Sequence, residues 1–101
     1  MEARVGDVGN LIIVDVYYLD SDRNKIPLDI SGATLLALDV IHTGNSTNAR
    51  WTCQCRQSTQ MSYTTKDGDL PIAETILITP YVEWSANRHF RGSEPIELYV
   101  I

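Results

Sequence analysis

The sequence has no apolar run near the roughly 20 residues that span a bilayer, and its first apolar stretch, residues 11–14, is far shorter than a signal-peptide core. It has no glycine-rich phosphate loop, no His-Glu-x-x-His motif and no nucleophile elbow. Eight basic residues stand against thirteen acidic ones and are spread along the chain, for a formal charge of -5. We therefore expect a non-enzymatic protein made in a cytosol, without a cofactor and without membrane or nucleic-acid partners.

Cysteine is also scarce, since Cys53 and Cys55 are the only two. On a strand such residues lie about 6.6 Å apart, which makes a disulfide between them awkward. A metal site would need His42 or His89 as further ligands. We interpret both cysteines as reduced, small core residues, with a metal or redox role as the alternative. Both histidines are expected at the surface or at a strand boundary.

Two acidic segments faintly resemble calcium-binding loops. Residues 67–69 are Asp-Gly-Asp, and residues 20–24 are Asp-Ser-Asp-Arg-Asn. Both lack the further oxygen ligands at the fixed spacing that a calcium loop requires. We interpret them as solvated turns and expect no metal site, because Asp and Asn side chains readily close turns.

What the chain does have is the composition of a globular domain. Its 101 residues suffice for one core, so we expect a single domain over residues 1–101. Apolar residues make up 44% of the chain and charged residues 21%, which is ordinary for a folded protein.

Apolar residues recur at period two in five segments, which predicts strands. Turn-forming residues separate these segments at 20–24, 43–48 and 85–88, while residues 64–71 predict an irregular crossing with at most one short helical turn. Two antiparallel layers would bury one face of each strand, so the expected fold is an all-β, two-layer antiparallel sandwich. The apolar faces are Ile12-Val14-Val16-Tyr18, Leu36-Leu38-Val40, Trp51-Cys53-Cys55, Ile76-Ile78-Val82-Trp84 and Ile96-Leu98-Val100.

A turn precedes the second long strand. Residues 25–40, KIPLDISGATLLALDV, pass through Asp29, Ser31 and Gly32 before the apolar face begins. These residue types predict a tight turn that swings the chain into the strand. Pro27 predicts a short edge pairing just before it, since an edge N–H needs no partner.

Three segments carry a resemblance to a known family. They are VGDVG at residues 5–9, IPLDISGAT at 26–34, and MSYTTKDGDL at 61–70, the last followed by the strand at 76–84. In this order they resemble the immunoglobulin-like β-sandwich domain of tailed-bacteriophage virion proteins, a family that includes the N-terminal domain of the lactococcal phage upper baseplate protein. The resemblance spans about residues 5–100. The family usually has a glycine before its last long strand, whereas residues 72–75 contain none.

The resemblance implies an immunoglobulin-like sandwich with a structural role in a virion assembled in the host cytoplasm. We expect a capsid decoration (cement) protein, present in many copies, that binds the major capsid protein or itself. A tail or baseplate adaptor is the alternative in the same class. Strand edges at residues 1–8 and 95–101 are expected to provide the contacts, with Tyr99 and Ile101 as candidate partner-binding residues. The alternative is that both side chains fold back onto the domain's own second sheet.

A carbohydrate-binding module is the alternative from another class. Trp51, Trp84 and Tyr81 would form its stacking platform. Both tryptophans lie on the apolar faces of their predicted strands, which favours core packing instead. A small hydrolase or metal protein is a third and weaker hypothesis.

Overall fold

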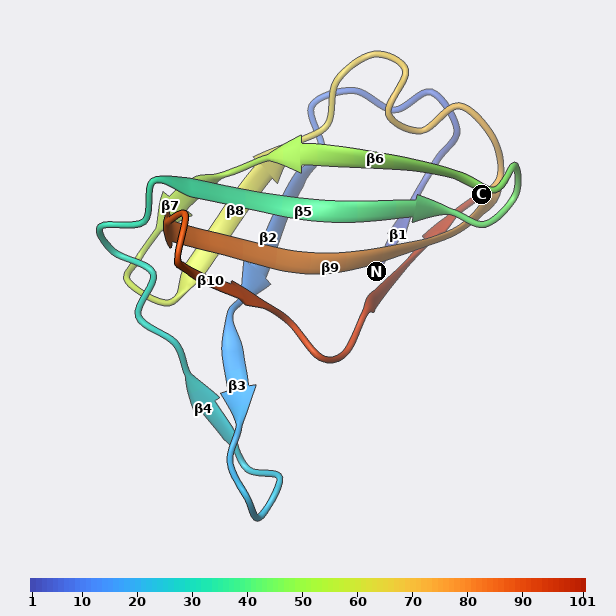
Figure 1. The fold of residues 1–101 in the computed structure, drawn as a ribbon. Helices are drawn as coiled ribbons and strands as arrows, with labels where there is room; N and C mark the ends of the chain where they lie inside the picture. The colour runs from blue at the N-terminus through green and yellow to red at the C-terminus, as the bar shows by residue number, and fades with distance from the viewer.

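The computed structural model describes residues 1–101 and contains eleven strands and no helix (Figure 1). It therefore has no helix long and apolar enough to cross a membrane. The strands are β1 (Glu2–Ala3), β2 (Leu11–Asp15), β3 (Tyr17–Leu19), β4 (Lys25–Pro27), β5 (Leu35–His42), β6 (Thr47–Thr52), β7 (Gln54–Arg56), β8 (Gln60–Thr64), β9 (Glu74–Ser85), β10 (Arg88–Arg91) and β11 (Ile96–Val100).

The larger of the two layers has the strand order β1-β11-β9-β5-β6, with β10 also paired to β9. The long strand β9 is its centre and pairs antiparallel with β5, β10 and β11. β1 and β11 pair in parallel, so the sheet is mixed at this edge alone. The two ends of the chain therefore lie side by side.

The smaller layer has the order β2-β8-β7 and covers the inner face of the larger sheet. After a single residue, Val16, the chain of β2 continues as β3, which pairs with β4 in a separate two-stranded hairpin. Figure 1 shows this hairpin projecting away from the body of the sandwich. The short pairing expected around Pro27 is thus found, with β3 as the partner strand.

The core lies between the two layers and contains most of the predicted apolar faces, together with residues that were not predicted: Ala3, Ile30, Met61, Tyr63 and Leu70. Leu38 is fully buried, and the same face of β5 also buries Leu36 and Val40. Trp84 is half-buried at its margin, and Tyr18 is exposed because it lies on the projecting hairpin. The prediction of an all-β sandwich is confirmed, and residues 64–71 form turns without a helical one.

Two of the segments that carry the family resemblance are joined by backbone hydrogen bonds. The N–H of Gly6 donates to the carbonyl of Leu70, and that of Gly9 donates to the carbonyl of Thr65, both at 2.8 Å. Both glycines have positive φ, 82° and 86°, which residues with a Cβ rarely adopt. Asp69 fixes the second segment by accepting the hydroxyl of Tyr63 at 2.5 Å. These motifs therefore hold the fold together at one end of the sandwich.

The turn at residues 29–32 forms as predicted. One carboxylate oxygen of Asp29 accepts both the backbone N–H of Ser31, at 2.9 Å, and its hydroxyl, at 2.5 Å. Gly32 has a φ of +80°, and Ile30 is buried in the core. The turn thus fixes residues 29–32 against the sandwich, through buried Ile30, just before β5 begins.

Candidate functional site

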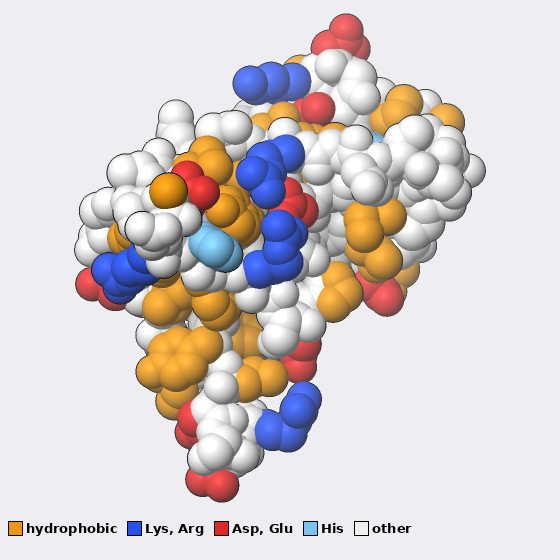
Figure 2. Space-filling model, viewed as in Figure 1, with side chains coloured by type: hydrophobic (Ala, Val, Ile, Leu, Met, Phe, Trp, Pro, Cys, Tyr) orange, Lys and Arg blue, Asp and Glu red, His pale blue; other side chains and the backbone are white.

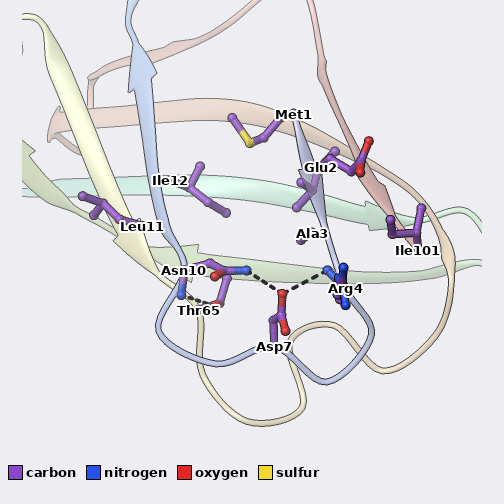
Figure 3. A pocket seen from close by; sticks show the side chains of 11 residues that line it. Met1, Glu2, Ala3, Arg4, Asp7, Asn10, Leu11, Ile12, Thr65 and Ile101 are labelled. Atoms are coloured by element: carbon purple, nitrogen blue, oxygen red, sulfur yellow. Dashed lines mark hydrogen bonds between the residues drawn. The ribbon is translucent and has the colours of Figure 1, made fainter.

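The largest hollow in the surface is a cleft of about 430 Å³ between β1 and β2 (Figure 3). Its volume lies within the range of small binding sites in proteins. In Figure 3, Ile12 points from β2 into the cleft, whereas Leu11 points away from it. The lining residues are Met1, Glu2, Ala3, Arg4, Asp7, Asn10, Leu11, Ile12, Thr65, Leu98 and Ile101.

The cleft exists because β1 and β2 each lie at one edge of their sheet, on the same side of the sandwich. β1 ends the larger sheet and β2 ends the smaller one, and no pairing joins the two strands. Residues 4–10 connect them and close one end of the cleft (Figure 3). Buried Ala3, Ile12 and Leu98 supply its apolar surface.

Asp7 holds the loop at this closed end. One of its carboxylate oxygens accepts the backbone N–H of Arg4 at 3.0 Å and the side-chain amide of Asn10 at 3.1 Å. The N–H of Asn10 in turn donates to the hydroxyl of Thr65 at 3.0 Å. The bond from Arg4, followed by that from Asn10, lowers the pKa of Asp7 below its ordinary value. The carboxylate is therefore ionised at neutral pH and fixes the distance between the two walls at this end.

β2 has one paired and one free edge. The N–H of Val16 donates to Thr59, and the carbonyl of Asn10 accepts from Thr65. Because hydrogen-bonded pairs alternate in an antiparallel ladder, even-numbered residues of β2 bond to β8. The backbone groups of Leu11 and Ile13 therefore point away from β8, toward the free edge.

β1 faces the cleft with a free edge as well. Met1 and Ala3 accept the N–H groups of Tyr99 and Ile101 in the parallel pairing with β11, at 3.0 and 2.9 Å. The residue between them, Glu2, therefore directs its backbone N–H and C=O away from β11, since alternate residues of a strand bond to opposite sides. Two free strand edges thus border the same cleft.

Exposed apolar side chains concentrate in the segments that build or adjoin the cleft. Nine large apolar side chains are exposed, and all but Tyr18 and Ile41 belong to residues 1–13 or 99–101, which leaves seven. Apolar groups exposed next to one another often mark a contact surface, whereas single exposed apolar residues are ordinary on any protein. The seven are Met1, Val5, Val8, Leu11, Ile13, Tyr99 and Ile101.

The structure separates the two residues predicted to contact a partner. Ile101 is exposed and lines the cleft. Tyr99 is exposed on the outer face of the larger sheet, where its hydroxyl donates to the carboxylate of Glu97. The expectation that residues 95–101 form a free edge is wrong, because β11 is paired on both sides, with β1 and β9. The other expected edge, residues 1–8, does contain an end strand, because β1 ends the larger sheet, and β2 ends the smaller sheet beside it.

The three aromatic residues considered for a carbohydrate platform do not share a surface. Trp51 is buried and stacks on Tyr63 with ring centroids 4.7 Å apart, so its predicted core role is confirmed. The guanidinium of Arg88 lies 4.4 Å from the ring centre of Trp84. Burial and the bond to Asp69 raise the pKa of Tyr63, which keeps its hydroxyl neutral as a donor.

The third aromatic residue, Tyr81, belongs to a charged cluster on the outer face of the larger sheet, where Figure 2 shows basic side chains gathered around an acidic one. Asp39 accepts hydrogen bonds from Arg50, at 2.7 Å, and from Arg91. Both guanidinium groups also lie over the Tyr81 ring, 4.5 and 5.2 Å from its centre. Partial burial acts to raise the pKa of Asp39, but the bonds from the two arginines outweigh it and lower the pKa. His89, exposed as predicted, stacks beside Tyr81.

His42 stands at a strand end, as expected, yet it is not exposed, and the core placement predicted for Cys55 is wrong. His42 is buried, with its Nδ1 2.7 Å from a carboxylate oxygen of Glu74, because it shares the inward face of β5 with Val40. Cys55 is exposed, because the chain leaves one sheet at Cys53 and joins the edge of the other as β7. Both cysteines are free, and burial raises the pKa of Cys53 to about 12.

The acidic segments serve as turns. Asp20 accepts the backbone N–H groups of Asp22 and Asn24, at 2.9 and 2.8 Å, and Asp69 accepts that of Lys66 at 2.7 Å. No group of three or more His, Cys, Asp and Glu side chains is placed to hold a metal ion.

Most residues of the cleft were not anticipated from the sequence. Asp7 stands in a recognised turn motif, yet nothing in that motif indicates that it bridges Arg4 and Asn10. The available signal was the uncharged, apolar start of β2, where Leu11 and Ile13 break the expectation that every second residue is polar. A scan against protein-family models and searches among curated proteins and solved structures find no match.

Proposed function

We propose that this chain is a non-enzymatic structural protein of a tailed-bacteriophage virion that docks on other proteins of the particle. The observation that carries the proposal is the concentration of exposed apolar side chains beside two free strand edges. The family resemblance of residues 5–100 supports the virion as the setting. A capsid decoration protein is the first candidate, and a tail or baseplate adaptor is the second.

Docking of this kind needs no strong single contact. Many copies on a symmetric shell or ring gain avidity even when each contact is weak. A carbohydrate-binding module is disfavoured because the three aromatic residues share no surface. Trp51 is in the core, and arginines cover the rings of Trp84 and Tyr81.

The proposal is tested by co-sedimentation of the purified protein with capsids and, separately, with tails of the virus that encodes it, prepared without this protein. We expect saturable binding to one of the two particles. Ile13→Asp should weaken that binding at least tenfold, whereas Ile41→Asp, a matched exposed site on β5, should not. Circular dichroism checks that both variants fold. Failure to bind either particle, or equal losses in both variants, would contradict the proposal.

A further inference from the structure

We propose that the cleft between β1 and β2 accepts one extended strand from a different protein, which pairs antiparallel with the free edge of β2. The identity of the donor as a virion protein rests on the proposed function. The capacity to accept a strand rests on the geometry of the cleft alone. An added strand would bridge the two layers where the sandwich is open.

The first reason is the state of the backbone. Leu11 and Ile13 direct unpaired N–H and C=O groups toward the free edge, and Glu2 does so from β1. Proteins usually protect such an edge with proline, lysine or a bulge. β2 has none of these: its sequence is LIIVD, and its register with β8 is regular. A row of free groups on an unprotected edge is the template used in strand addition.

The second reason is the apolar surface beside this edge. Ala3, Ile12 and Leu98 line the cleft, so a strand lying there would pack every second side chain on them. At the far end of β2 the edge is obstructed, because the hydroxyl of Tyr17 holds Glu94 at 2.8 Å and the segment 92–96 lies beside Asp15. The accessible part is therefore the section from Leu11 to Ile13.

Charge identifies the donor as another protein. A second copy would bring its own charge of -5 to a cleft whose lining holds Glu2 and Asp7 against Arg4. In addition, the alternating apolar segments of this chain already form its own layers. The fitting occupant is a strand that has apolar side chains at alternate positions, no charge in its middle and basic residues at its ends.

The register also specifies which donor groups bond to β2. Residues directly opposite in an antiparallel pair place their side chains on the same face. Leu11 and Ile13 present theirs to solvent, so the bonding donor residues are those whose side chains also point outward. Blocking the N–H groups of these residues should abolish pairing without changing the apolar face of the donor.

The test uses the full chain, labelled with ¹⁵N, and the capped peptide Lys-Thr-Val-Thr-Val-Thr-Lys, with the valines intended to face the cleft. We expect the amide signals of Leu11 and Ile13 to shift, and their hydrogen exchange to slow at least tenfold at saturating peptide. The matched control is the same peptide with N-methyl groups on its threonines, which should produce neither effect. Equal binding of both peptides, or shifts confined to other residues, would overturn the proposal.

A variant provides the second arm. Ile13→Pro removes an N–H that no group of the chain uses, and proline is tolerated at such an edge position. We expect it to abolish peptide binding, whereas Ile13→Thr, which keeps the N–H, should retain it. If Ile13→Pro does not fold, the N-methyl comparison decides alone. A dimer that protects the Leu11 amide without peptide would show that a second copy fills the cleft, and would refute a different donor.

The outcomes also separate this proposal from the proposed function. Peptide binding at β2 without binding to any particle would refute the virion role and leave the strand-accepting site intact. Undiminished particle binding by folded Ile13→Pro would leave the virion role intact and would show that pairing with β2 is not the contact made in the particle.

Discussion

The two layers of the sandwich meet along two sides, here called seams, and only one of the two is closed by packed side chains. At the first seam the chain passes from β6 in the larger sheet to β7 in the smaller one through a single residue, Cys53. Trp51 of β6 stacks on Tyr63 of β8 across the same seam. At the second seam β1 and β2 are unpaired, and a cleft separates them.

The difference follows from how the chain crosses between layers. A crossing of one residue draws the two sheets together and leaves room only for packed side chains, so Trp51 and Cys53 are buried. The crossing through residues 4–10 is long enough to leave the strands apart, and a cleft remains between β1 and β2. One seam is closed by the chain itself, and the other stays open.

The largest expected effect comes from breaking the closed seam. Trp51→Ala should reduce the free energy of unfolding by about 3–5 kcal/mol, because it removes a buried aromatic ring and leaves a cavity between the layers. Urea denaturation measures the loss. Tyr18→Ala, on the projecting hairpin, is the aromatic control and should change stability by less than about 0.5 kcal/mol. A loss below about 1 kcal/mol for Trp51→Ala would show that the stack does not close this seam.

The second expected effect is a difference in thiol reactivity at the closed seam. Cys53 is buried and its pKa is raised to about 12, so at pH 8 almost none of it is thiolate, whereas Cys55 is exposed. With a thiol reagent in native buffer, Cys53 should react at least about 100-fold more slowly than Cys55, because it must first become exposed by local opening. Cys53→Ser and Cys55→Ser assign the two phases. Equal reaction rates for Cys53 and Cys55 would mean that Cys53 is accessible to the reagent and that this seam is not closed.

Alternation of apolar residues was enough to predict the long strands of the larger sheet and their buried face, since Leu38 and Trp51 lie where period two places them. It failed where the chain changes layer, at Cys55, and where a polar residue shares an inward face, at His42. The strand β8 was missed although Met61 and Tyr63 alternate with polar residues, because the segment is short and runs into a turn motif. The cleft could not be predicted, because it depends on which strands fail to pair.

A third, smaller effect concerns the charged cluster, which lies away from both seams. Asp39→Asn should cost about 1 kcal/mol at pH 7, since the two arginines that it holds are largely exposed. The pKa of Asp39 is below its ordinary 3.8, so this contribution is complete above that pH and is lost as the pH falls through the lowered value. Urea unfolding should therefore show that the free-energy difference between Asp39→Asn and wild type is smaller near pH 2 than at pH 7. If the difference in unfolding free energy between Asp39→Asn and wild type is the same at both pH values, the loss does not come from the ionised carboxylate.

The smallest effect on stability is expected at the open seam. Leu11 keeps 54% of its surface exposed, so Leu11→Ala should change the free energy of unfolding by less than about 0.5 kcal/mol. Its neighbour Ile12, which is buried and points into the sandwich, is the matched control, and Ile12→Ala should cost about 2–5 kcal/mol. A loss above about 1 kcal/mol for Leu11→Ala would mean that Leu11 packs within the isolated chain. The outer face of β2, on which Leu11 points away from the cleft, would then already be covered by the chain itself.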